Sequence, residues 1–358
     1  MITILYPYRN RELSRIKRSL DSLAQQKQQN FSVVFVDYGS EENLAYEIKK
    51  LIDQYSFASY EYLFTRQQPW SKSKALNYGI KNLSSEYCFT ADVDIIFHPQ
   101  FTEILEKHLN TSKVIYFKVG FLTEEESMKL IDFEEYKISF LTNEEATGMT
   151  LFPVEKLKLI NGFDEFFHFW GAEDTDIHNR LRNLGCKVQF YDQNTLLLHQ
   201  WHPNYRKRET IRLNKELQLK GAVELNHKHI KYNFEKGITK VNSKAWGCIM
   251  NKTDYETLLN LHLREMSNEV SVINHFLFVA LSDGNTSVIS VRIIKNPVEK
   301  TLKYKIKKLL GKKVPEFYSI KEINDKLLLH IVAYQHHLPY VYSISEDFSS
   351  IDFKMIRK

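Results

Sequence analysis

Two carboxylates close an apolar segment early in the chain, and their spacing suits a metal ion. Asp92 and Asp94 lie in the run Ala-Asp-Val-Asp-Ile-Ile-Phe, directly after residues typical of a buried strand. Hard oxygen ligands suit a divalent cation, and such a cation suits a diphosphate. Asp94 is the better metal ligand, whereas Asp92 could hold ribose hydroxyls or a metal-bound water. A D-x-D pattern alone is weak evidence, because many surface loops contain one.

A histidine pair further along the chain could complete this site. His199 and His202 follow an apolar strand and are three positions apart, so one or both imidazoles can reach the same cation. A lone histidine is more often structural, but a pair that follows carboxylate motifs favours the metal interpretation. Mixed oxygen and nitrogen ligands fit Mn2+ and do not exclude Mg2+.

Carboxylates also cluster at the expected start of a helix. Glu173, Asp174 and Asp176 follow an aromatic run that ends at Trp170. Capping of the helix N-terminus is their structural explanation. Three carboxylates exceed what a cap needs, so we expect one of them to act as a general base on an attacking hydroxyl. The aromatic run can form an apolar platform for a sugar ring.

The segment after the first expected strand could bind a diphosphate. Pro7 should stop that strand, and Arg9 and Arg11 follow at a helix start, where cations and backbone N–H groups can hold an anion. On these residues alone, a solvated turn is the favoured interpretation. Asp37 ends the second expected strand, where it could accept the N3–H of uracil or cap the next helix.

A tryptophan and two lysines open a later helix. Trp70 could stack on a nucleobase, and Lys72 or Lys74 could meet phosphate. Packing in the core is the alternative for Trp70.

The elements that must position these residues alternate between strand and helix. Such alternation predicts an α/β fold with a doubly wound, mainly parallel sheet, in which ligands bind beyond the C-terminal strand ends. We expect strands at Ile2–Tyr6, Ser32–Val36, Tyr60–Phe64, Tyr87–Ala91, Val114–Lys118, Gly148–Pro153, Lys187–Tyr191 and Thr195–Leu198, with helices between them. Thr123–Asn143 is expected to be loop or surface helix.

The last third of the chain changes in character. It lacks clustered carboxylates, which predicts a catalytic domain over residues 1–222 and a smaller C-terminal α/β region over 223–358 that serves acceptor, membrane or oligomer contacts. The segment 300–313 is rich in lysine, with apolar residues at helical spacing. It is either a solvated helix or a peripheral membrane contact.

Composition restricts the protein class. Hydrophobic residues make up 43% and charged residues 26% of the 358 residues, so a packed core is expected. Cys88, Cys186 and Cys248 form no disulfide or zinc pattern, and the sequence contains neither a signal peptide nor a membrane-spanning stretch. We therefore expect a cytoplasmic protein. The net charge of +5 is modest, and no nucleic-acid partner is expected.

Taken together, the motifs resemble a known family. The order PYRNR, WSKSKALN, ADVDIIF, TGMTLFP, NGFDEFFHFWGAEDTD and H-x-x-H resembles the inverting β-1,4-galactosyltransferases, and also bacterial family 2 transferases and chondroitin-type polymerases. The resemblance covers residues 2–205. It implies a GT-A (Rossmann-like) fold, a UDP-sugar donor, a manganese ion and inversion of the anomeric centre.

The resemblance also implies roles for single residues. Arg9 and Arg11 would lie near the nucleotide, and Trp70 and Lys72 near the uracil. Asp94 and His202 would bind the metal with His199 as third ligand, Asp174 would be the catalytic base, and Glu173 and Trp170 would contact the sugars. Ala172 departs from the family pattern, which has glycine there.

We therefore expect a metal-dependent inverting glycosyltransferase that moves galactose, N-acetylgalactosamine, N-acetylglucosamine or glucuronate from a UDP-sugar. Its acceptor would be a glycan or lipid-linked glycan in bacterial surface polysaccharide synthesis, because the sequence lacks the stem and anchor of Golgi enzymes. A retaining transferase on the same fold and a sugar-nucleotide-binding scaffold without turnover are the alternatives.

Overall fold

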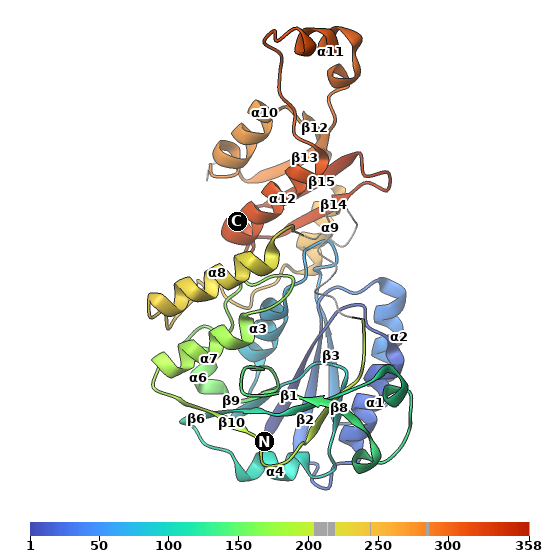
Figure 1. The fold of residues 1–358 in the computed structure, drawn as a ribbon, viewed down its shortest axis with the longest axis vertical. Helices are drawn as coiled ribbons and strands as arrows, with labels where there is room; N and C mark the ends of the chain where they lie inside the picture. The colour runs from blue at the N-terminus through green and yellow to red at the C-terminus, as the bar shows by residue number, and fades with distance from the viewer. Residues whose placement is uncertain (204–212, 214–218, 244, 284–285, 358) are drawn as a thin grey trace. The chain divides into compact units, whose positions relative to one another are not determined.

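The chain folds into two compact units. The computed structural model describes residues 1–203, 213, 219–243, 245–283 and 286–357 (Figure 1). Unit 1 comprises Met1–Arg66, Trp70–Tyr205 and Val223–Cys248, and unit 2 comprises Gln67–Pro69, Arg206–Ala222 and Ile249–Lys358. The units interleave along the chain, so the domain boundary predicted after residue 222 stays a prediction.

A seven-stranded sheet forms the centre of unit 1. Its order is β10-β6-β9-β4-β1-β2-β3, and all neighbours are parallel except β9, which runs antiparallel to β4 and β6. The predicted α/β fold with a mainly parallel, doubly wound sheet is confirmed. The strands are β1 (Ile2–Tyr8), β2 (Phe31–Asp37), β3 (Ala58–Tyr62), β4 (Tyr87–Thr90), β6 (Lys113–Phe117), β9 (Thr150–Pro153) and β10 (Lys187–Tyr191).

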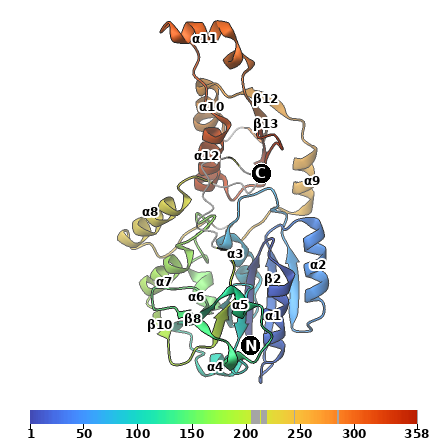
Figure 2. The same cartoon turned by 45° about the vertical axis from the view of Figure 1, so that its right-hand side comes forward.

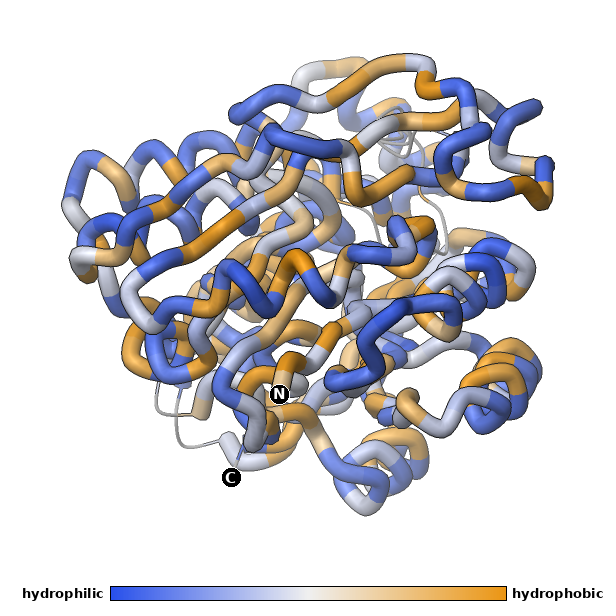
Figure 3. Tube along the Cα trace, turned by 90° about the horizontal axis from the view of Figure 1, so that it is seen from below, coloured by the Kyte–Doolittle hydropathy of each residue, from blue (hydrophilic) through white to orange (hydrophobic). Residues whose placement is uncertain are grey.

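Helices cover both faces of this sheet. In Figures 1 and 2, α1 (Leu13–Ala24) and α2 (Glu42–Ile52) lie on one side, and α3 (Lys72–Asn82), α6 (Val154–Leu159) and α7 (Glu173–Asn183) lie on the other. Hydrophobic and hydrophilic stretches alternate along the peripheral helices (Figure 3), as expected when one helix face packs on a core. Ile16 and Leu20 of α1 pack with Phe35 of β2, and α4 (Phe101–Lys107) contributes Phe101 to the same core.

The first strand is longer than the sequence predicted. Pro7 was expected to end it, but β1 continues to Tyr8, and Pro7 is buried opposite Val36 of β2. The strand β4 pairs with β1 only as far as Leu5, so the missing N–H of Pro7 leaves no ladder bond to β4 unmade.

A second sheet of unit 1 has the order β5-β11-β7-β8. Its strands are β5 (Ile95–Phe97), β7 (Val119–Leu122), β8 (Ile138–Leu141) and β11 (Leu197–His199). The segment expected to be loop or surface helix contains α5 (Glu124–Ser127), a 3-10 turn at Phe133–Glu135 and β8. The four residues of β8 are exposed, so the strand lacks the alternation of buried and exposed residues that identifies strands in sequence.

Unit 2 has its own sheet and core. The order is β12-β13-β15-β14, with strands β12 (Arg264–Ser267), β13 (Val288–Ile294), β14 (Tyr340–Ile344) and β15 (Ser350–Ile356). Its helices are α9 (Lys252–Asn260), α10 (Val270–His275), α11 (Leu302–Leu309) and α12 (Ile320–His330). Leu327 of α12 and Phe353 of β15 are fully buried in its core. None of the helices in the described ranges is long and apolar enough to cross a membrane.

Candidate active site

Strand pairing brings the first carboxylate motif to the histidines. The D-x-D lies in the short link between β4 and β5, so Asp94 comes directly before β5. The antiparallel pairing of β5 with β11 sets Ile95 opposite His199. Asp94 and His199 are therefore neighbours across the ladder, although more than a hundred residues separate them. The turn after β11 then carries His202 to the same place.

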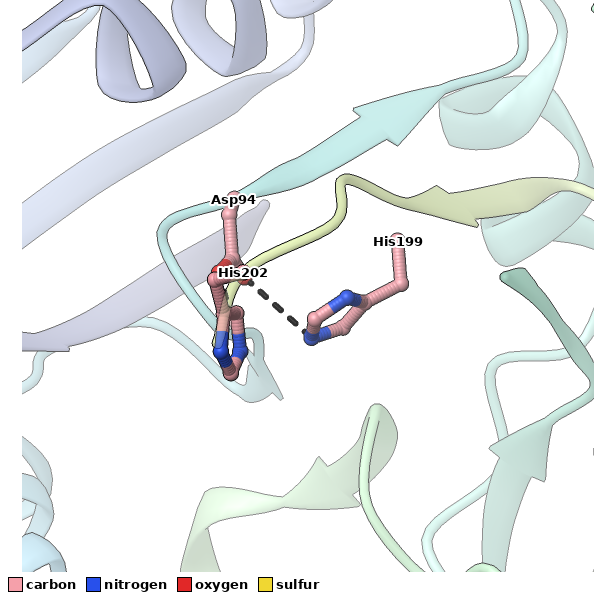
Figure 4. A group of neighbouring side chains, drawn as sticks. All are labelled: Asp94, His199 and His202. Carbon is pink, nitrogen blue, oxygen red and sulfur yellow. Dashed lines mark ion pairs between the residues drawn. The ribbon is translucent and has the colours of Figure 1, made fainter. Parts of the chain in front are cut away.

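The three side chains converge on one point (Figure 4). The Nε2 atom of His199 lies 3.5 Å from Oδ1 of Asp94, and Nε2 of His202 lies 3.6 Å from Oδ2. All three offer ligand atoms within 4.8 Å of one another. Oδ1 of Asp94 is buried and has no hydrogen-bond partner among the described residues. A buried, unsatisfied carboxylate oxygen facing two imidazoles fits a divalent cation, and the predicted convergence of these three residues is what the structure shows.

Neighbouring groups fix the orientation of these ligands. The His199 ring stacks on Phe121 of β7, with 4.5 Å between ring centroids. Gln200 is fully buried, and both its backbone N–H and its side-chain Nε2 donate to the carbonyl of Asp94, each at 3.1 Å. No sequence pattern singled out Gln200, although it stands inside the H-x-x-H motif.

Lys72 lies among carboxylates from two other parts of the chain. Its Nζ atom lies 2.9 Å from Oδ2 of Asp174, 3.5 Å from Oδ1 of Asp92 and 3.6 Å from Oε1 of Glu173. Lys72 starts α3, which follows the half-buried Trp70, and Glu173 and Asp174 start α7. The lysine expected near the donor thus lies between both acidic motifs.

Burial and charge set the ionisation of this cluster. Burial raises the pKa of Glu173 to about 7, and the neighbouring Asp174 acts in the same direction. Burial also raises the pKa of Asp174, although Lys72 opposes this effect. For Lys72 itself, burial acts to lower the pKa, but Asp174, Asp92 and Glu173 outweigh it and hold the pKa well above its usual value.

Asp92 links the lysine cluster to the metal-binding residues. Burial acts to raise its pKa, but Lys72, His199 and His202 together lower it. Because both histidines act on this carboxylate while Lys72 lies 3.5 Å from it, the two clusters belong to one site.

A loop of left-handed residues leads into α7. Phe169, Gly171 and Ala172 all have positive φ, and the Gly171 φ of 91° suits glycine best. Ala172, where the resembling family has glycine, adopts φ 78° and is the N-cap of α7 without a side-chain cap. Trp170 is 42% exposed in this loop, so its indole can meet a ligand.

Asn226 of α8 (Ala222–Glu235) supports this loop. Its Nδ2 group approaches the carbonyls of His168 at 3.0 Å, Trp170 at 3.0 Å and Gly171 at 3.3 Å. The side chain is 3% exposed, so these bonds are made in the interior. Asn226 is a positioning residue that no sequence motif marked.

The third acidic residue of α7 has a structural place. Asp176 is fully buried and bonds Nε of Arg180 at 2.6 Å and Nδ2 of Asn233 at 2.8 Å. Asn233 also donates to Asp164, which pairs with His229 of α8 at 2.9 Å. This network anchors α7 to α8, and the α7 carboxylates that face Lys72 are Glu173 and Asp174.

The predicted nucleotide-binding residues gather at the ends of β1 and β2. The Arg9 guanidinium lies 6.0 Å from the centre of the Tyr38 ring, and Trp70 meets the same ring edge-on at 5.6 Å. Arg11 is half-buried. Its backbone carbonyl accepts a hydrogen bond from the Tyr8 hydroxyl.

Two of the residues predicted to contact the UDP-sugar are buried. Asp37 is fully buried; it accepts from the Ser40 backbone N–H at 2.8 Å and from the Tyr60 hydroxyl at 2.6 Å. The alternative that Asp37 caps the next helix is wrong, because Glu41 is the N-cap of α2, and Asp37 instead closes the turn to Ser40. Its contact with uracil stays a prediction. Lys74 is 2% exposed, and burial lowers its pKa. The carboxylate that opposes this effect is Glu165, which is not one of the carboxylates around Lys72.

Family comparisons agree with this architecture. Residues 3–160 match the family described as Glycosyl transferase family 2, and residues 129–202 match one described as N-terminal domain of galactosyltransferase. The α/β fold with its large, mainly parallel sheet agrees with the GT-A type. Each match covers less than half of the chain, so the chain is similar to these glycosyltransferase families over residues 3–202.

Curated relatives match part of the chain. Beta-1,4-galactosyltransferase 6 of Mus musculus is 28% identical over 132 residues, which is 37% of this chain and 31% of that protein. Beta-1,4-galactosyltransferase 5 of Homo sapiens is 27% identical over 135 residues, or 38% of this chain and 31% of that protein. The match thus spans under a third of the length of these relatives.

Solved structures also resemble the chain. S. aureus TarS 1-349 in complex with UDP has a TM-score of 0.46 at 12% identity, covering 96% of this chain and 94% of that one. The catalytic domain of Drosophila beta1,4galactosyltransferase 7 in complex with xylobiose has a TM-score of 0.39 at 15% identity, covering 63% and 79%.

Proposed function

We propose that this protein is a metal-dependent inverting glycosyltransferase that moves a sugar from a UDP-sugar to a glycan acceptor. The observation that carries the proposal is the continuity of the site: Asp92 connects the Asp94–His199–His202 group to Lys72, Glu173 and Asp174. One side of such a site can hold a diphosphate, and the other can take a proton from an acceptor.

Asp94, His199 and His202 would hold Mn2+, with Mg2+ as the second choice. Two imidazoles and one carboxylate form a mixed nitrogen and oxygen ligand set, which suits Mn2+ better than the all-oxygen sites typical of Mg2+. The bound ion would neutralise negative charge on the leaving UDP diphosphate. Gln200 serves this function by holding the backbone of Asp94 in place.

Asp174 would act as the general base. Its carboxylate would accept the proton of the acceptor hydroxyl while the hydroxyl oxygen attacks the anomeric carbon and the bond to UDP breaks. Lys72 opposes the rise in the Asp174 pKa that burial causes. Glu173, whose pKa is raised to about 7, can donate or accept a hydrogen bond to a sugar hydroxyl near neutral pH.

The nucleotide would lie over the ends of β1 and β2. Arg9 and Arg11 would contact its phosphates, and Trp70 would stack on uracil beside Tyr38. Trp170, exposed in the loop before α7, would pack against the acceptor or donor sugar.

The donor is tested by measuring UDP release from UDP-galactose, UDP-N-acetylgalactosamine, UDP-N-acetylglucosamine and UDP-glucuronate, with Mn2+ and then with EDTA. The names of the curated relatives put UDP-galactose first in this panel. Release from one donor that stops with EDTA supports the proposal. Turnover that persists with EDTA contradicts the metal role. Calorimetric binding of UDP with no turnover on any glycan acceptor would favour a scaffold.

The base is tested with Asp174→Asn. The variant should bind UDP normally but lose transfer by about 10²–10⁴-fold, because proton removal contributes about that much to such reactions. Asp53→Asn, at a carboxylate with a side chain 58% exposed at the end of α2, is the matched control and should transfer normally. Wild-type transfer by Asp174→Asn would exclude Asp174 as base. The anomeric coupling of the product in proton NMR separates inversion from retention.

The physiological setting is part of the proposal. The resemblance of the motifs to bacterial family 2 transferases supports a role in surface polysaccharide synthesis. Cys88, Cys186 and Cys248 are all free thiols, which suits a reducing cytoplasm. Cell fractionation with an antibody against the protein would test this location, and recovery from a secreted fraction would contradict it.

A further inference from the structure

Helix α11 carries its apolar residues on the face opposite to its attachment. Tyr304 is the half-buried residue of the helix; its hydroxyl donates to the Pro315 carbonyl at 3.1 Å, and its ring lies 5.5 Å from Phe317. No residue of α11 is buried. Figures 1 and 2 show the helix standing apart from the sheet and the other helices of unit 2.

The exposed face is a continuous apolar stripe. Leu302, Ile306 and Leu309 follow the spacing of one helix face, and at about 100° per residue that face lies nearly opposite Tyr304. They are 73%, 47% and 88% exposed. Leu310 extends the stripe and is 63% exposed. A helix packed against its own protein shows the reverse arrangement, with its apolar side inward.

Lysines flank the stripe on both sides. The segment 300–313 contains seven lysines and no acidic residue. Lys303 and Lys307 border one edge of the apolar face, and Lys305 and Lys308 border the other. Long lysine side chains can lay their methylene stems along an apolar surface and keep their charge at its rim.

We propose that α11 docks this protein on an anionic lipid bilayer. The helix lies parallel to the surface, with Leu302, Ile306 and Leu309 among the upper acyl chains and the lysines against anionic headgroups. The positive charge of α11 is complementary to such a surface. A soluble polyanion would also attract this charge, but it would leave the leucines of the apolar stripe in water. The segment also lacks the arginines and exposed stacking aromatics typical of nucleic-acid binding.

The docking does not depend on the proposed sugar transfer, so it is tested by binding alone. The full chain is sedimented with phosphatidylcholine vesicles and with vesicles that also contain phosphatidylglycerol. We expect binding to the anionic vesicles only, and weaker binding as salt is raised. Equal binding to both vesicle types, or to neither, would overturn the proposal.

Two variants separate charge from the apolar stripe. The first replaces Lys303, Lys305, Lys307 and Lys308 with Gln and should weaken partitioning by roughly several hundredfold, since each lysine contributes about fivefold near an anionic surface. Its matched control replaces the exposed lysines of unit 1, namely Lys27, Lys50, Lys187 and Lys228, and should bind as the wild type does.

The second variant replaces Leu302, Ile306 and Leu309 with Asn and should bind at least about tenfold more weakly at unchanged charge. Binding like the wild type would show an electrostatic contact alone and overturn the docking geometry. A preference of the wild type for an oligonucleotide over anionic vesicles would also overturn it. Because these side chains are exposed, melting temperatures should be unchanged; if the triple variant unfolds, Leu309→Asn alone gives the same comparison.

Discussion

Replacing Lys72 by methionine removes the cation that three carboxylates share. The ammonium lies 2.9 Å from Asp174, 3.5 Å from Asp92 and 3.6 Å from Glu173, and methionine keeps much of the apolar stem. The change should therefore act on ionisation more than on packing. Without Lys72, burial and mutual repulsion act unopposed, and the pKa values of the carboxylates rise.

The size of the effect follows from these distances. A cation this close to a carboxyl group lowers its pKa by about 1–3, and with 18% of the Lys72 side chain exposed, solvent screening is limited. Losing that cation should move the acid limb of the kcat/KM profile to a pH higher by at least about 1. At a fixed pH below the limb, the rate then falls at least about tenfold, because less of the enzyme holds an ionised base.

The assay is UDP release with acceptor present, measured from about pH 5 to about pH 9 for the wild type, Lys72→Met and Lys72→Arg. Activity of Lys72→Met should recover as the pH rises, whereas Lys72→Arg keeps the charge and should retain the wild-type limb. The limb belongs to the interacting carboxylates as a group. If Lys72→Met lost rate equally at every pH, the assigned electrostatic role of Lys72 would be refuted.

Other predictions concern the metal, stability and the loop before α7. Asp94→Asn should weaken Mn2+ binding by at least about a hundredfold in calorimetry, and unchanged affinity would place the ion elsewhere. The raised pKa of Glu173 means that the folded protein holds a proton which the unfolded chain has released, so stability falls as pH rises from 4.5 to about 7, by roughly 3 kcal/mol. At high pH, the free energy of unfolding of Glu173→Gln in urea should exceed that of the wild type by that amount, and below pH 4.5 the two should be equal. A gain in stability that does not depend on pH would contradict the raised pKa. Asn226→Ala leaves buried carbonyls, including that of Trp170, without this donor. It should lower the free energy of unfolding by about 1–3 kcal/mol and raise the KM for the sugar substrate. The exposed control Asn260→Ala should change neither.

Local patterns explain how much of the site the sequence could predict. Strand and helix periodicity indicated the parallel sheet, and the order of sheet strands brings their C-terminal ends to one edge. The convergence of Asp94, His199 and His202 followed from their chemistry, because a metal site needs its ligands together whatever their separation in sequence.

Contacts without such a chemical signature could not be predicted. The hydrogen bond between Lys72 and Asp174 joins the starts of two helices, and the two residues are 102 positions apart in sequence. Each residue on its own is typical of an ordinary helix terminus. Asn226 and Asn233 act from α8, in a segment that carries no motif. The strand β8 escaped prediction because neither of its faces is buried.

The pairing of β5 with β11 has a consequence for synthesis of the chain. Asp94 emerges from the ribosome long before His199, and the two are brought together by the short ladder between β5 and β11, which pairs Ile95 with His199. A nascent chain shorter than about 200 residues would therefore have one half of the proposed ion site and no means to complete it. Capture of an ion at the proposed site would then be a late event, and it would report that the second sheet of unit 1 has assembled in register.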